Sequence, residues 1–163
     1  MTASGIDPNY TAVLVYGDSA GSTPLWRLRP GTTEVVVVPE PSLQRNLQSR
    51  QAHEEAVGRM TLATDGRVRY RLAAERPASG VVVETKYFPE EPILHELGHT
   101  FGLHHSPDGH EVMNAPARSS GYMSPREREA MLLLLARPAG NRYPDNDRGV
   151  ATAGRAQAVI LCR

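Results

Sequence analysis

The chain is poor in the features that mark disulfide-linked, membrane-embedded and nucleic-acid-binding proteins. Its single cysteine is Cys162, so no disulfide can form within the chain. The apolar run at residues 131–136 is far too short to cross a bilayer, because a membrane-spanning helix needs about 20 apolar residues. Its 18 basic and 18 acidic residues cancel, which leaves no net field to attract nucleic acid or an anionic membrane. We therefore expect neither a nucleic-acid partner nor a membrane partner.

The beginning of the chain also lacks the pattern of a leader segment. Residues 1–10 contain neither the basic start nor the apolar core of a signal peptide. This favours a cytoplasmic protein, and the alternative is a secreted protein whose export segment has been removed. At 163 residues the chain has the length of one domain with a sizeable core.

What the sequence does contain is a specific histidine motif. Residues 95–105 read His-Glu-Leu-Gly-His-Thr-Phe-Gly-Leu-His-His and match H-E-x-x-H-x-x-G-x-x-H. Five fixed residues would coincide by chance in about one of twenty thousand chains of this length. Residues four apart lie on one face of a helix, so His95 and His99 can direct imidazole nitrogens at one metal ion. Glu96 lies beside the first of these ligands, within reach of a water on the metal.

The rest of the motif returns the chain to the same ion. Gly102 falls about one turn after His99, where a glycine can adopt a positive φ and end the helix. His105 follows three residues later and can complete a three-histidine zinc site with a fourth position for water. His104 is the alternative third ligand, and the spacing after the turn favours His105.

The segment resembles the zinc signature of the metzincin metallopeptidases. Met113 lies eight residues after His105, at the place of the methionine turn that underlies the metal in this family. This spacing, with Ser106 and Pro116, resembles the matrixin branch, and the spacing also resembles the archaemetzincins, which contain little beyond the catalytic domain. Ser106 and Glu111 stand where archaemetzincins have cysteines for a second zinc, so the comparison implies a single zinc ion.

The resemblance implies an α+β fold. We expect a metzincin-like zincin: a twisted mixed β-sheet with a helix on it, an active-site zinc helix and a small C-terminal subdomain. Residues 1–163 would form one catalytic domain, with an upper part at 1–102, a lower part at 103–137 and a peripheral tail at 138–163.

The implied activity is zinc-dependent hydrolysis of peptide bonds in a peptide or protein substrate. One catalytic Zn²⁺ held by the three histidines activates a water, and Glu96 is the general base. Gly102 and Met113 have structural roles at this site. Two alternatives remain open: a metzincin-fold protein that binds zinc without turnover, and a zinc hydrolase for a non-peptide amide or ester. A general base beside the metal has no evident use in a pure binder, which favours the enzyme.

Outside the motif, composition and spacing predict the remaining elements. Runs of β-formers predict strands at 10–16, 25–29, 34–38, 80–88 and 158–161. A helix is predicted over 42–58 with Ser42 as its cap, and another over 125–137 with a capping box of Ser124 and Glu127. The pair Asp65-Gly66 predicts a hairpin between residues 60–64 and 67–72.

Some side chains outside the metal site are interpreted individually. Leu94, Leu97 and Phe101 repeat at helical spacing opposite the histidines and should form the buried face of that helix. His53 is interpreted as an exposed histidine on a solvated helix face. Cys162 is interpreted as a semi-buried thiol, with a role as a zinc cap as the alternative.

The segment after the methionine turn carries a prediction about specificity. In metzincins this segment lines the pocket for the residue after the scissile bond, and here it spans residues 115–123. Its side chains are mostly small, with Tyr122 as its one aromatic residue. The resemblance therefore predicts a pocket beside Tyr122 that prefers a medium or large apolar side chain.

Overall fold

The computed structural model describes residues 28, 31–86, 92–114, 121–136 and 156–158. The described strands are β1 (Glu34–Pro39), β2 (Arg69–Leu72), β3 (Val81–Thr85) and β4 (Ala156–Ala158). They form one four-stranded sheet in the order β2-β1-β3-β4. With its helices this sheet makes a small α+β fold, which confirms the predicted class at that level. All described pairings are parallel, so the mixed sheet that we expected is not found in this part of the chain.

The central strand β1 follows directly from its sequence. Val35, Val36 and Val37 are all buried, and β1 lies between β2 and β3 in the sheet. A continuous apolar run of this kind is typical of a strand that is covered on both sides. The predicted strand at 34–38 is thus confirmed, as is the predicted strand within 80–88.

The helical segment after β1 differs from the prediction at both ends. It forms a short helix α2 (Pro41–Gln44) and a long helix α3 (Leu47–Ala63). The cap of α3 is Asn46, whose side-chain oxygen accepts a hydrogen bond from the Ser49 amide at 3.0 Å. Ser42 therefore does not cap the main helix, and α3 continues through residues that we predicted to be extended.

The predicted hairpin around Asp65-Gly66 is wrong. Both residues have the expected positive φ, 52° and 73°, but they connect the end of α3 to β2, which pairs in parallel with β1. Thr61 explains the change of partner, because its hydroxyl oxygen accepts a hydrogen bond from the Tyr70 amide at 2.9 Å. The turn therefore packs β2 against the helix that precedes it.

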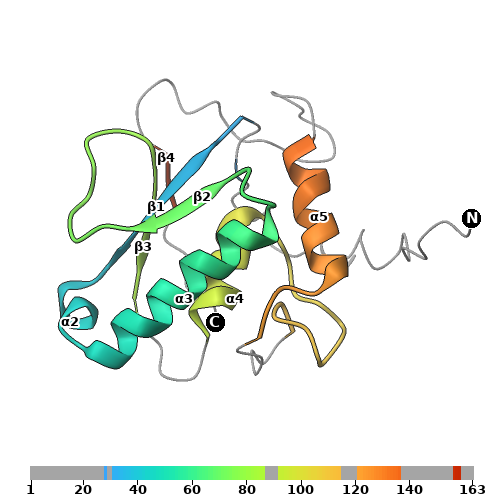
Figure 1. Cartoon of the computed structure of the whole chain (residues 1–163), viewed down its shortest axis with the longest axis horizontal. Helices are drawn as coiled ribbons and strands as arrows, with labels where there is room; N and C mark the ends of the chain where they lie inside the picture. The colour runs from blue at the N-terminus through green and yellow to red at the C-terminus, as the bar shows by residue number, and fades with distance from the viewer. Residues whose placement is uncertain (1–27, 29–30, 87–91, 115–120, 137–155, 159–163) are drawn as a thin grey trace, which may run out of the picture.

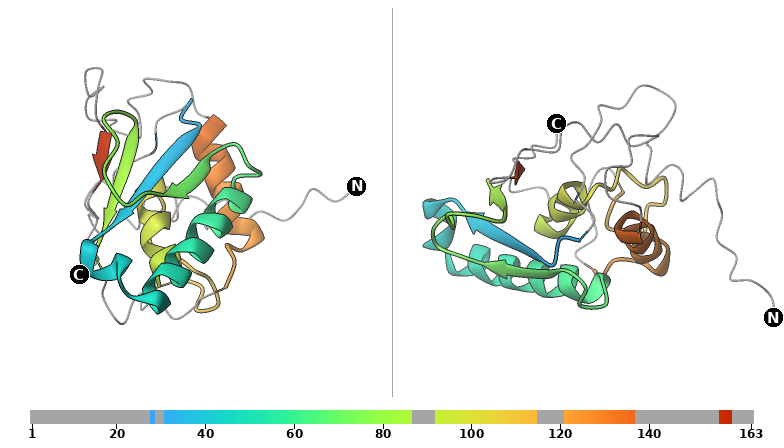
Figure 2. Two further views of the ribbon diagram at one scale, coloured as in Figure 1. Left: turned by 60° about the vertical axis from the view of Figure 1, so that its left-hand side comes forward. Right: turned by 90° about the horizontal axis from the view of Figure 1, so that it is seen from above.

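The helices lie around the sheet in a simple arrangement. In Figure 1 the long helix α3 crosses in front of the strands, and the views in Figure 2 show α5 (Pro125–Ala136) on the side of the molecule away from β3 and β4. Helix α3 contacts both β2 and the histidine-bearing helix α4 (Ile93–Phe101). The core between these elements includes Leu94, Leu97 and Phe101, as predicted.

The start of α5 confirms the predicted capping box. The Ser124 hydroxyl accepts a hydrogen bond from the Glu127 amide at 3.1 Å, and the Glu127 carboxylate accepts one from the Ser124 amide at 2.6 Å. The helix buries Ala130, Met131 and Leu134, while Leu133 is 52% exposed.

The remaining predictions concern strands near the two ends of the chain and the absence of a membrane-spanning helix. The strand predicted at 10–16 lies outside the described residues, as do nearly all of residues 25–29 and of the C-terminal tail. The described strand β4 overlaps the strand predicted at 158–161 only at its first residue. Among the described helices, none has the length and apolarity required to cross a bilayer.

Candidate metal centre

Helix α4 carries the first part of the histidine motif and ends where the motif requires. Its last helical residue is Phe101, and Gly102 follows with a φ of 117°, which only glycine adopts at low cost. The Gly102 amide donates hydrogen bonds to the carbonyl oxygens of Gly98 and His99, at 3.2 and 3.1 Å. These bonds close the helix and turn the chain at the residue where the sequence predicted a positive φ.

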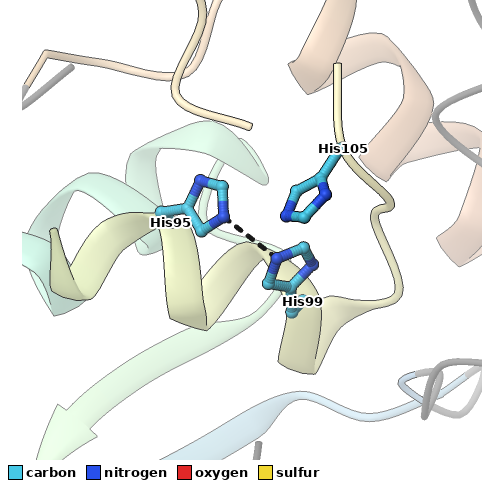
Figure 3. Close-up of side chains that lie close together, drawn as sticks. All are labelled: His95, His99 and His105. Carbon is cyan, nitrogen blue, oxygen red and sulfur yellow. Dashed lines mark hydrogen bonds between the residues drawn. The ribbon is translucent and has the colours of Figure 1, made fainter. Parts of the chain in front are cut away.

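The turn brings three imidazoles together. His95 and His99 project from one face of α4, and His105 faces them from the segment after the helix (Figure 3). Their ring centroids lie 4.6, 5.3 and 4.9 Å apart, and one potential ligand atom from each ring lies within 4.8 Å of the others. This cluster could hold a metal ion. The neighbouring His104 is buried but does not belong to it, in agreement with the choice of His105.

Backbone carbonyls orient the two helical histidines. The Nδ1 atom of His95 lies 2.6 Å from the Val112 oxygen, and the Nδ1 atom of His99 lies 2.8 Å from the Leu103 oxygen. A carbonyl oxygen only accepts, so both Nδ1 atoms carry the proton and both Nε2 atoms present a lone pair. Hydrogen bonds from the ring nitrogen that faces away from the metal are the usual way in which proteins orient histidine ligands.

The separation of the two Nε2 atoms also suits a shared ion. They lie 3.0 Å apart, although neither carries a proton to share in this tautomeric state. Two nitrogens on a tetrahedral ion, each at about 2.0–2.1 Å, would be about 3.3 Å apart. The residues present therefore fit a metal with imidazole ligands.

His99 is electrically suited to bind a metal. Burial, together with the adjacent imidazoles of His95, His105 and His104, lowers the pKa of His99 to about 3. The ring is therefore neutral near pH 7, and a neutral imidazole is the form that coordinates a metal.

A floor of two buried methionines, Met113 and Met123, packs against α4 at Gly98. Met113 is fully buried, and a Cβ atom at Gly98 would stand 2.2 Å from its sulfur. The methyl carbon of Met123 would be 3.2 Å from the same point. The predicted role of Met113 as a floor is consistent with this packing. Met123 belongs to the same floor but was not predicted, because it lies ten positions after Met113 and has no fixed spacing to the motif.

The backbone around Met113 also holds the segment that carries His105. The Ser106 amide donates a hydrogen bond to the Met113 oxygen at 2.6 Å, and the Asn114 side-chain amide donates one to the Ser106 oxygen at 3.1 Å. The two chain segments thus form a short bridge directly after His105. The loop from His105 to Met113 is closed on itself, which fixes the third histidine relative to the floor.

Ser106 and Glu111, which stand where archaemetzincins have cysteines, belong to a buried polar cluster. The Glu111 carboxylate accepts hydrogen bonds from the hydroxyls of Ser106 and Ser124, both at 2.6 Å. It is also paired with Arg126, whose Nε lies 3.2 Å away and whose guanidinium bonds to Asp108 as well. The cluster joins the loop after His105 to the first turn of α5.

Glu96, the predicted general base, is shielded from solvent, whereas Tyr122, the predicted pocket residue, is exposed. Glu96 lies on α4 beside His95, and both of its carboxylate oxygens are shielded from solvent. Tyr122 is 68% exposed, and its ring lies under the guanidinium of Arg59 on α3, 4.8 Å from ring centroid to carbon. Residues 115–120 of the predicted pocket wall lie outside the described residues, as does Cys162.

The interpretation of His53 as an exposed histidine is wrong. Its side chain is 1% exposed, its Nδ1 lies 2.8 Å from the Ser49 oxygen, and its Nε2 lies 2.8 Å from the Thr85 hydroxyl. The helix predicted over 42–58 is broken after Gln44, so that α3 begins only at Leu47. Leu47 is consequently 68% exposed, while the face with His53 packs on the sheet. His53 is a structural residue between α3 and β3.

Comparison with known families and curated proteins identified no relative of this chain. No protein-family profile matches the chain, and a comparison with curated protein sequences found no match. The site itself is therefore the basis for inferring function: a helix with two histidines, a glycine turn, a third histidine and a methionine floor.

Proposed function

We propose that the protein is a zinc-dependent metallopeptidase of the metzincin kind. The observation that carries this proposal is the convergence of His95, His99 and His105, with the two helical rings held by backbone carbonyls. Three neutral imidazoles with one remaining coordination position are a typical donor set of catalytic zinc sites. The glycine turn and the methionine floor add support, because each matches a part of the metzincin signature at its own position.

The residues around the three histidines fit a hydrolytic reaction. A zinc ion, when bound, supplies Lewis-acid chemistry that acidifies water and polarises a carbonyl group. Glu96 is beside His95 on α4, and its buried carboxylate can accept a proton from the attacking water and return it to the leaving nitrogen. His99 suits the role of a neutral ligand, because burial and the adjacent imidazoles lower its pKa to about 3.

A peptide bond is the proposed target because the resemblance to metzincins is specific to peptidases. The exposed ring of Tyr122 remains our proposed determinant of the pocket for the residue after the scissile bond. Its contact with Arg59 holds it at the surface of α3, next to Met123 of the floor. We propose that this position prefers medium or large apolar side chains in the substrate.

The test combines a metal measurement with a peptide library. Purified protein is loaded with zinc, its metal content is measured by mass spectrometry, and cleavage of a degenerate fluorogenic peptide library is followed. We expect one zinc per chain and cleavage that a chelator abolishes. Zinc binding without cleavage would contradict the peptidase and point to a binding protein or a non-peptide hydrolase. Failure to bind zinc would contradict the metal site as well.

A further inference from the structure

One peptide unit below the histidines is hydrogen-bonded on both sides. The Val112 carbonyl oxygen accepts the Nδ1 proton of His95 at 2.6 Å. The amide N–H of the same peptide unit, which belongs to Met113, donates to the Oε1 atom of Glu127 at 2.7 Å. The unit therefore connects a carboxylate on α5 to a metal-site imidazole on α4.

Glu127 makes this second contact in addition to its role at the start of α5. The capping box uses the Oε2 atom, which accepts the hydrogen bond of the Ser124 amide, and leaves Oε1 for the Met113 amide. The side chain is 0% exposed, and burial raises the pKa of Glu127 while its two backbone hydrogen bonds oppose that rise. Both N–H···O distances are short, as is usual for an ionised acceptor.

We propose that Glu127 is a positioning residue for His95, acting through the peptide unit between Val112 and Met113. A charged acceptor on the N–H of an amide draws electron density towards its carbonyl oxygen, since hydrogen bonds in a chain polarise one another. The Val112 oxygen then accepts the Nδ1 proton more strongly, which fixes the tautomer and the ring plane and raises the basicity of Nε2. The inference rests on the metal site of the proposed function and does not depend on hydrolysis.

The chain offers a matched control for this role. Ser124→Ala removes the hydroxyl that accepts the Glu127 amide and donates to Glu111, and so weakens the cap, but keeps the Ser124 backbone N–H and the contact from Glu127 to Met113. Glu127→Ala removes the cap and the contact to Met113 together. Glu127→Gln keeps the side-chain volume and removes the charge. It therefore tests the same contact if the alanine variant does not fold. A purely structural role in capping α5 predicts the same effects in all of these variants.

The first readout uses the metal-free protein and nuclear magnetic resonance. In the wild type we expect His95 to show the Nδ1-protonated form and the Met113 amide proton to lie downfield. Both Glu127 variants should shift the Met113 amide proton upfield and perturb the His95 ring nitrogens, whereas Ser124→Ala should leave both signals near their wild-type positions. Equal signals in the Glu127 variants and in Ser124→Ala would overturn the proposal, whether or not the protein binds zinc or cleaves peptides.

The second readout is zinc affinity, measured by competition with a chromophoric chelator. Loss of an outer-shell partner costs about 10–100-fold in metal affinity. We expect a loss of at least about 10-fold for Glu127→Ala, a smaller loss for Glu127→Gln, and less than about a 2-fold change for Ser124→Ala. A Ser124→Ala loss as large as that of Glu127→Ala would overturn the proposal, because the effect would then follow from the cap alone.

Discussion

At position 98 the helix passes so close to the methionine floor that the absence of a side chain matters. A methyl group there would stand 2.2 Å from the Met113 sulfur and 3.2 Å from the Met123 methyl carbon, both of which are buried. A side chain at position 98 would force Met113 to shift, although the φ of Gly98 is not in the left-handed region. Glycine in a helix interior costs about 1 kcal/mol relative to alanine, so the close approach must offset this cost.

Replacing Gly98 with alanine should therefore destabilise the protein rather than stabilise its helix. Overpacking a core typically costs about 1–3 kcal/mol, and we expect a loss in this range in denaturant unfolding of the metal-free protein. Gly58 on α3 is the control, because a Cβ there meets no atom within 4 Å and Gly58→Ala should be neutral or stabilising. The double variant Gly98→Ala/Met113→Ala should lose less than the sum of the two single losses, and full additivity would mean that the two side chains do not meet.

The role of Glu96 can be distinguished from that of a metal ligand, because its replacement should affect turnover but not zinc content. It lies beside His95 on α4 but is not among the three histidines that converge. Glu96→Ala should keep the wild-type zinc content and lower turnover by about 10²–10⁴-fold, the usual contribution of a general acid–base. The measurement is zinc content by mass spectrometry together with peptide cleavage rates. Near-normal turnover in this variant would mean that another residue is the base.

For single helices, strands and turns, the sequence predicted the local backbone conformation better than it predicted which elements pack against one another. The positive φ values of Asp65 and Gly66 were implied by their identities, yet the turn ends α3 and begins a parallel strand. Local chemistry selects the shape of a turn, but the packing of α3 on β2 decides which elements it joins. His53 shows the same limit, because the predicted helix is broken before α3 and the face of α3 with His53 packs on the sheet.

The burial of His53 predicts an acid-sensitive contact between α3 and β3. Burial lowers the pKa of His53 below 6.5, so the folded state binds this proton more weakly than the unfolded state does. Its contribution to stability is therefore full above pH 6.5 and is lost as the pH falls below that value. In the metal-free protein, the decrease in the free energy of unfolding between pH 7.5 and 5 should be smaller in His53→Gln than in the wild type. Identical decreases in the two proteins would contradict a neutral, buried His53.

At the scale of the whole molecule, the motif and its surroundings were predictable to different degrees. The histidine cluster, the Gly102 turn and the capping box depend on spacings of a few residues, and the structure confirms their geometry. The order of the strands, the floor residue Met123 and the contact from Glu127 to Met113 depend on segments far apart in the chain. No local pattern predicts such contacts, because they arise only when the core assembles.

The metal should stabilise the fold as a whole, because its candidate ligands join α4 to the loop that follows. A ligand that binds only the folded state adds about 2.7 kcal/mol of stability at one hundred times its dissociation constant. We expect added zinc to raise the melting temperature of the wild type. His105→Ala should lose most of this shift, whereas His104→Ala should retain it, since His104 is not in the cluster. Equal losses would indicate that the chain leaves α4 in a different direction.

The most direct test of the central claim is zinc-edge X-ray absorption of the loaded protein. We expect the zinc to have nitrogen and oxygen ligands only, at about 2.0–2.1 Å, with the more distant scattering of three imidazole rings. His105→Ala should reduce that scattering to two imidazoles. A sulfur ligand at about 2.3 Å would contradict the account, because it would place a thiolate such as that of Cys162 where His95, His99 and His105 are proposed to hold the ion alone.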